Sequence, residues 1–326
     1  MEDRLISLCR HSACYKVFDR EMTYGGSHAY LLLSEDPALL DRMVTLLCMR
    51  VYCPVACGTC AECHKVLSGN KMDVAQPNPL GEKLTADQAR SIAEDAVMGA
   101  YEGGYKVYVL RAMDQQRDVV QNILLKTLEE PNPKVMFLLT ASSTKGVLPT
   151  VLSRVKTLPQ CKLTVGEVAD VLSERSVKDG GFWARCSGGN LALAVNLSQD
   201  DKYVETIDRT TAMLLHLKRS QEVVDYVFSP DFDKENIART LDVLSVVLED
   251  LLMIAGGNPQ AVTYLSQTAT YRLVLQDLPY RALPALMNLA EVAKQKLQAN
   301  CNPQSVADSL LLGYLEEKAN ANHYRN

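Results

Sequence analysis

Five cysteines lie between positions 48 and 63, and three of them follow one another at the spacing of a metal site. The segment Cys57-Gly-Thr-Cys60-Ala-Glu-Cys63 contains two successive C-x-x-C steps. In a reducing compartment, clustered thiols indicate metal binding rather than disulfides, and zinc takes such ligands in a tetrahedron. The spacing therefore predicts a zinc site that includes Cys57, Cys60 and Cys63.

The spacing leaves the fourth zinc ligand open. Cys53 lies four residues before Cys57, and Cys48 lies nine before it. His64 is a third candidate, but it directly follows a ligand. Four sulfur ligands would close the coordination shell, which is typical of a structural site rather than a catalytic one. Lys65 is the only basic residue just downstream, so we expect little direct reading of DNA by this module.

A second position where chemistry is expected follows the apolar run from His28 to Ser34. A strand and a helix that meet in this way carry the motif G-x-x-x-x-G-K-[ST] in P-loop NTPases, where backbone amides and the lysine hold the phosphates. The segment from Ser34 to Arg42 has no glycine, and Glu35 and Asp36 would repel a triphosphate. The sequence therefore predicts that this junction binds no nucleotide.

The carboxylates that hold magnesium in such enzymes are missing as well. They are expected at the end of a strand, yet the run from 106 to 110 continues as Arg111-Ala-Met-Asp114. Asp114 is the only acid in that segment and lies too far along the chain. We therefore expect neither nucleotide binding nor ATP hydrolysis by this chain alone.

The elements that position these residues alternate through the first half of the chain. The patterns predict strands at 28–34, 106–110, 135–140 and 155–158, and helices at about 37–49, 85–99, 118–130 and 148–154. The first 27 residues look irregular. This alternation predicts a parallel sheet with helices on both faces, so we expect residues 1–160 to form an α/β domain with the cysteine module at 48–63.

No strong strand pattern appears in the second half. Residues 161–202 are predicted to form a small helical domain, with Ser187-Gly-Gly as a turn between two helices. Residues 203–326 are predicted to be helical throughout. Two apolar stripes support this second helical domain: Leu241, Leu244, Leu248 and Leu251, and then Leu286, Leu289, Ala293 and Leu297.

The composition is that of an ordinary globular protein. Apolar residues make up 47% of the chain and charged residues 22%, and the net charge is −5. This acidic balance argues against a basic surface for nucleic acid and favours protein partners. No signal peptide and no apolar run of membrane length is visible, so we expect a cytoplasmic protein without membrane contact.

Three stretches closely resemble bacterial DNA polymerase III clamp-loader subunits, the delta-prime and gamma/tau family of AAA+ proteins. The first two are Asn122-Ile-Leu-Leu-Lys-Thr-Leu-Glu-Glu-Pro131 and Leu148-Pro-Thr-Val-Leu-Ser-Arg154. The third is the pattern C-x8-C-x2-C-x2-C that begins at Cys48. The resemblance covers about residues 25–200 well, whereas the C-terminal third matches mainly in its helical character.

The resemblance implies an AAA+-like, P-loop NTPase fold for residues 1–160, a lid at 161–202 and an oligomerisation collar at 203–326. It implies Cys48 as the fourth zinc ligand, which leaves Cys53 as a spare thiol. The family's loop, laid on this chain without gaps, puts Leu40 at the lysine position and Asp41 at the Ser/Thr position. The arginine that senses nucleotide in motor subunits falls near Leu193. These departures agree with one another and point to the delta-prime branch.

Ser153 and Arg154 match the Ser-Arg part of the family's Ser-Arg-Cys motif, although Val155 replaces the cysteine. The resemblance implies that Arg154 is an arginine finger, which would offer permanent charge and several fixed donors to a phosphoryl group in trans. The alternative is a surface arginine at the C-terminus of a helix, where a cation is also favourable. Lys126, Glu129 and Glu130 have the same two readings, as a solvated helix face or as an interface.

The resemblance thus implies a non-hydrolysing, delta-prime-type subunit of the sliding-clamp loader, within the DNA polymerase III holoenzyme. Its expected partners are gamma/tau motor subunits and the delta subunit, with the sliding clamp and primer-template DNA reached through the complex. Two alternatives remain at this point. One is an ATP-binding gamma/tau-like motor, and the other is a stand-alone zinc-containing protein that binds nucleic acid.

Overall fold

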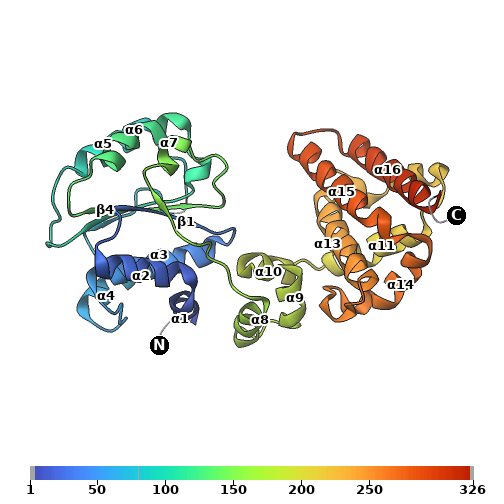
Figure 1. Ribbon diagram of the computed structural model, residues 1–326, viewed down its shortest axis with the longest axis horizontal. Helices are drawn as coiled ribbons and strands as arrows, with labels where there is room; N and C mark the ends of the chain where they lie inside the picture. The colour runs from blue at the N-terminus through green and yellow to red at the C-terminus, as the bar shows by residue number, and fades with distance from the viewer. Residues whose placement is uncertain (1–3, 80, 324–326) are drawn as a thin grey trace. The chain divides into compact units, whose positions relative to one another are not determined.

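The computed structural model describes residues 4–79 and 81–323. The chain divides into two compact units, each of which is described by itself (Figure 1). The first unit consists of Met1–Val177 with Ser187–Val195, and the second of Lys178–Cys186 with Asn196–Asn326. The predicted boundaries of three domains at 160 and 202 stay a prediction.

A parallel sheet forms the centre of the first unit. Its strands lie in the order β2-β3-β4-β1-β5, and every neighbouring pair is parallel. Buried apolar runs without alternation, as in β1, β3 and β4, are expected of strands covered on both faces. The predicted parallel α/β architecture is therefore confirmed. The strands are β1 (Ala29–Leu33), β2 (Val74–Ala75), β3 (Lys106–Leu110), β4 (Val135–Ala141) and β5 (Lys156–Thr157).

Helices cover both faces of this sheet (Figure 1). One layer holds α5 (Ala86–Asp95), α6 (Asp118–Glu129) and α7 (Pro149–Leu152), and the opposite layer holds α1 (Arg4–His11), α2 (Ala13–Tyr24) and α3 (Pro37–Tyr52). The short helix α4 (Ala61–Leu67) follows the cysteine-rich loop. On the α5–α6 side, Tyr108 stacks on Phe137 from the neighbouring strand at 5.2 Å between ring centroids.

The expectation of an irregular N-terminus is wrong, because α1 and α2 occupy residues 4–24. Ser12 caps α2 by accepting a hydrogen bond from the Tyr15 amide at 3.2 Å. Phe18 of this helix is fully buried and meets Tyr30 edge-on, with ring centroids 4.9 Å apart. Burial against the sheet therefore stabilises a helix whose own apolar pattern is short.

The helices α8 (Val165–Glu174), α9 (Gly180–Cys186) and α10 (Leu191–Ser198) follow the sheet, and the predicted Ser187-Gly-Gly turn lies between α9 and α10. At Gly189 φ is +92°, and a β-carbon there would lie 2.5 Å from the Leu163 carbonyl oxygen. A side chain does not fit at this point, which explains the glycine.

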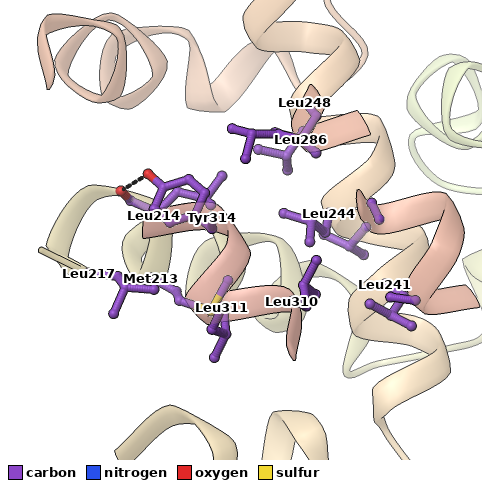
Figure 2. Close-up of a cluster of buried hydrophobic side chains, with 14 of the residues drawn as sticks. Met213, Leu214, Leu217, Leu241, Leu244, Leu248, Leu286, Leu310, Leu311 and Tyr314 are labelled. Carbon is purple, nitrogen blue, oxygen red and sulfur yellow. Dashed lines mark hydrogen bonds between the residues drawn. The ribbon is translucent and has the colours of Figure 1, made fainter. Parts of the chain in front are cut away.

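The second unit is helical. Leu241, Leu244, Leu248 and Leu251 of α13 are buried, as the apolar stripe predicted. Figure 2 shows three of these leucines beside Leu286 and Leu310 from later helices. Tyr314 donates a hydrogen bond through its hydroxyl to the Leu214 carbonyl at 2.9 Å (Figure 2). This bond fixes α16 (Pro303–His323) on α11 (Tyr203–His216). The main helices are α11 (Tyr203–His216), α12 (Val223–Val227), α13 (Ile237–Ala255), α14 (Thr268–Asp277), α15 (Leu283–Gln298) and α16 (Pro303–His323).

Across residues 4–79 and 81–323, no helix combines the length and the apolar character that crossing a membrane requires.

Candidate functional site

The four thiols of Cys53, Cys57, Cys60 and Cys63 gather at the end of α3 and the start of α4. Their sulfur atoms all lie within 4.8 Å of one another, with Cys57 3.8 Å from Cys53 and 4.0 Å from Cys63. A tetrahedron of sulfurs about 2.3 Å from zinc has edges of about 3.8 Å. The four thiols can therefore hold a metal ion of this kind.

Backbone amides prepare this group for metal binding. The Cys60 amide donates to the Cys57 sulfur at 3.3 Å, and the Cys63 amide donates to the Cys60 sulfur at 3.5 Å. Hydrogen bonds from Thr59, first from its side chain, lower the pKa of the Cys57 thiol to about 5. Donors of this kind stabilise the thiolate form that a metal requires.

Cys48, which the family resemblance implied as the fourth ligand, does not join this group, and Cys53 takes that place among the four thiols. The helix α3 runs on to Tyr52, and five residues of helix turn Cys53 well away from the direction of Cys48. Cys48 is 2% exposed on the core side, where burial raises the pKa of its thiol to about 12. His64 lies outside the group of four as well.

Two sets of charged contacts fix the cysteine module on the first unit. Arg10 of α1 donates to the carbonyl oxygens of Val55 and Ala56, at 3.1 Å and 2.8 Å. On the other side, the buried Lys71 ammonium pairs with Glu62 of α4 at 2.6 Å and with Glu102. These contacts orient the loop and the helix that carry the thiols.

The strand–helix junction at Ser34–Asp36 is closed by the chain's own hydrogen bonds. The Asp36 carboxylate is buried, and its Oδ1 accepts from the Leu39 amide at 3.0 Å as the N-cap of α3. Its Oδ2 accepts from the Leu191 and Ala192 amides of α10, at 2.7 Å and 3.2 Å. Two helix N-termini thus point at one carboxylate.

A second charged pair lies beside this junction. Arg111, which directly follows β3, places Nη2 2.7 Å from Oδ1 of Asp41 on α3. The Asn78 side chain accepts from the Arg111 amide at 3.0 Å and holds that turn of the backbone. The pair borders a cavity of about 580 Å³ at the carboxyl ends of β1, β3 and β4.

The other residues that the sequence placed at nucleotide-binding positions are one acid, Asp114, and two aliphatic residues, Leu40 and Leu193. Asp114 lies in a single 3-10 turn after β3, not at the strand end, and accepts hydrogen bonds from the backbone and hydroxyl of Ser142. Leu40 is 8% exposed, and Leu193 is 41% exposed on α10. Neither aliphatic side chain carries a charge that could pair with a phosphate.

Arg154 lies at the C-terminal end of α7, next to its cap residue Ser153. Its Nη1 donates to the Thr150 carbonyl at 2.9 Å and contacts the Ser153 hydroxyl at 3.2 Å. Nη2 lies 3.2 Å from Glu129 of α6, and the side chain is 29% exposed. Among the described residues its Nε has no hydrogen-bond partner. The structure therefore brings two motifs of the sequence, the Glu129 segment and the Arg154 segment, into direct contact.

Comparison with known proteins finds relatives of this chain among the subunits of DNA polymerase III. A family model described as "DNA polymerase III, delta subunit" matches residues 11–163. The subunit delta' of DNA polymerase III from Bacillus subtilis is 27% identical over 88% of this chain and 90% of its own length. The corresponding subunit from Pseudomonas aeruginosa is 33% identical over 39% of this chain and 41% of its own length.

The chain is thus similar to DNA polymerase III delta-prime subunits, in the Bacillus subtilis case along most of its length. The tau subunit from Bacillus subtilis is a more distant relative, 21% identical over 85% of this chain and 55% of that protein. A solved gamma subunit-related protein from Thermotoga maritima has a TM-score of 0.40 and 16% identity over 97% of this chain and all of its own. The segment that this family model matches, residues 11–163, contains the four thiols, Asp36 and Arg154.

Proposed function

We propose that this protein is the non-hydrolysing, delta-prime-type subunit of a replicative clamp loader. In this role it acts in the cytoplasm with gamma/tau motor subunits and a delta subunit, and the complex loads the sliding clamp on primer-template DNA. The observation that carries the proposal is the chemistry of the strand–helix junction. Asp36 accepts hydrogen bonds from the amides that begin α10, and Arg111 pairs with Asp41, so the chain's own charges engage the groups that a nucleotide would need.

Arg154 is the residue through which this subunit acts on its neighbour. A guanidinium carries permanent charge and several donors, and the Arg154 side chain is 29% exposed beside its contact with Glu129. A partly exposed ion pair of this kind contributes about 0–1 kcal/mol, so a phosphate can replace the carboxylate at low cost. In the proposed complex Arg154 meets the γ-phosphate of ATP bound by an adjacent motor subunit.

The four thiols hold a structural zinc ion in this proposal. Four sulfur ligands leave no open position for water or substrate, so the ion supplies folding energy to the loop and to α4 rather than catalysis. The chain's own residues then keep α4 in place through Lys71 and its two glutamate partners.

The decisive experiment is a loader reconstituted with its motor and delta subunits, in which the ATPase stimulated by DNA and clamp is measured. We expect Arg154→Ala to assemble normally and to lower the rate by about 10³-fold or more, the range for an arginine finger supplied in trans. Lys156→Ala is the matched control, because Lys156 is an exposed cation two residues on that also pairs with a carboxylate, Glu21. Equal rates for wild type and Arg154→Ala would refute the role in trans.

The relationship to tau subunits makes an ATP-binding motor the main competing function. Titration of the isolated protein with Mg-ATP, followed by calorimetry, separates the two functions. We expect no binding heat, because the junction offers a buried carboxylate where a phosphate would have to lie. Stoichiometric binding of Mg-ATP would favour the motor function instead.

A further inference from the structure

Three successive backbone amides at the start of α10 donate hydrogen bonds to side-chain oxygens. The Leu193 amide donates to Asn190, the N-cap residue, at 2.9 Å. The Leu191 and Ala192 amides donate to Asp36, which is more than 150 residues earlier in the chain. Most helices leave such amides to water or to one local cap. Here a distant carboxylate takes two of them.

The same carboxylate is already engaged at the start of α3. Its second oxygen accepts from the Leu39 amide, and Pro37 at the first helical position has no amide hydrogen to satisfy. The Ser34 hydroxyl accepts from the Asp36 amide at 3.1 Å and fixes the loop backbone. Asn190 adds a contact between the segments by donating to the Glu35 carbonyl at 3.2 Å. Asp36 is 3% exposed, so little solvent screens these contacts.

We propose that Asp36 is a built-in anion that joins the N-termini of α3 and α10 in the place where a bound phosphate would otherwise join them. Helix N-termini attract anions, because their free amides and their dipoles both favour negative charge. Asp36 supplies this negative charge from within the chain. The loop at 34–36 and α10 are therefore held together without a ligand.

The neighbouring charged pair is separate from this contact. The Arg111 guanidinium lies 2.7 Å from Asp41 and borders the cavity at the strand ends, whereas Asp36 is not part of the lining of that cavity. The Asp36 carboxylate is therefore left to the two helix N-termini. The inference rests on the proposed function only in treating loop 34–36 as a former phosphate position, and it does not depend on Arg154.

Hydrogen exchange on the full-length protein, measured by mass spectrometry over residues 190–196, tests this inference. In Asp36→Ser the hydroxyl can still cap α3 but is too short to reach α10, so the loss should be confined to α10. Loss of two hydrogen bonds to a charged acceptor should speed exchange there by about tenfold or more. In Asp36→Asn the amide keeps a single oxygen, so it can serve only one of the two helices.

Glu35→Gln is the matched control, because it removes an adjacent but exposed carboxylate. We expect its exchange to equal that of wild type. Unchanged exchange over 190–196 in both folded Asp36 variants would overturn the inference and leave the loader role untouched. A rise in protection of the wild-type segment on addition of Mg-ATP would instead overturn the proposed nucleotide-free function together with this inference.

Discussion

Cys53 is the last residue before Pro54, and this proline explains why its thiol faces the other three. A proline cannot continue a helix and disfavours helical backbone in the residue before it, so α3 ends at Tyr52 and the chain turns. Cys53 then lies in the loop with Cys57, whereas Cys48 remains one and a half turns back on the buried face of α3. Spacing alone does not distinguish these two thiols, but the position of the proline does.

The first prediction concerns metal content. Cys53→Ser should bind less than one equivalent of zinc or lose it readily to a chelator, because only three sulfurs remain. Cys48→Ala should keep one equivalent of zinc, although the loss of a buried thiol should lower the free energy of unfolding. Zinc measured by atomic emission on purified protein, with a competing chelator, checks both. Retention of zinc in Cys53→Ser and its loss in Cys48→Ala would instead show Cys48 to be the fourth ligand, as the family resemblance implies.

For Arg154, a structural role and the proposed functional role predict different losses of unfolding free energy on mutation. Its partners are a helix carbonyl and a carboxylate whose side chain is 58% exposed, which are weak contacts. We therefore predict that Arg154→Ala lowers the free energy of unfolding by only about 1 kcal/mol or less. Urea denaturation checks this value, with Glu130→Gln as a control next to Glu129. A loss of several kcal/mol would mean that the arginine supports the fold.

At the scale of elements, an ion pair between a buried lysine and a half-exposed aspartate ties the end of α5 to β3. The Lys106 side chain is 2% exposed and its ammonium lies 2.7 Å from Asp95, whose other oxygen accepts from the Tyr108 hydroxyl at 2.6 Å. The hydrogen bond from Lys106, followed by that from Tyr108, lowers the pKa of Asp95 below its ordinary value of 3.8. A carboxyl whose pKa is lowered by folding stabilises the fold above that ordinary value, and this contribution disappears as the pH falls through the lowered pKa.

Asp95→Asn should therefore cost about 1–3 kcal/mol at neutral pH, because it leaves a buried ammonium without its charged partner. The difference from wild type should shrink as the pH falls below 3.8, where the carboxyl takes up a proton in the unfolded state, and should disappear as the pH falls through the lowered pKa of the folded state. Urea denaturation of both proteins at neutral and acidic pH measures it. Asp87→Asn, at the exposed start of the same helix, should change little at either pH. A constant difference across the pH range would argue against the ion pair.

The sequence predicts elements whose apolar pattern is strong and leaves out those that depend on partners far along the chain. The strands predicted at 28–34, 106–110 and 135–140 are confirmed as β1, β3 and β4, and the helices predicted at about 37–49 and 118–130 are confirmed as α3 and α6. The two-residue strand β2 exists only because β3 pairs with it. Similarly, Asp36 looked repulsive to phosphate in the sequence, but its partners on α10 could not be found without the fold.

At the scale of the whole molecule, the two units contain different natural probes. The four thiols belong to the first unit, whereas Trp183, the only tryptophan of the chain, belongs to the second. The indole donates to the Lys178 carbonyl at 3.1 Å and lies 4.7 Å from the Phe182 ring and 6.0 Å from the Tyr203 ring, between centroids. Fluorescence therefore reports on the second unit and metal release on the first.

We predict that a zinc chelator lowers the unfolding midpoint of the first unit but leaves the Trp183 midpoint unchanged. The physical reason is that the ion stabilises only the segment it binds, while the core around Trp183 is formed within the second unit. Hydrogen exchange over residues 53–67 and tryptophan emission, followed through the same denaturant series, check the two parts. A parallel shift of both midpoints would mean that the units unfold together.

The carboxylate between α3 and α10 has one property that no dissolved ion shares. Because Asp36 is attached to α3, its effective concentration at the start of α10 does not fall on dilution, and no competing solute can carry it away. An exchangeable phosphate would leave with every turnover and return with the supply of ATP. In the proposed role, the geometry of this junction therefore does not depend on the ratio of ATP to ADP.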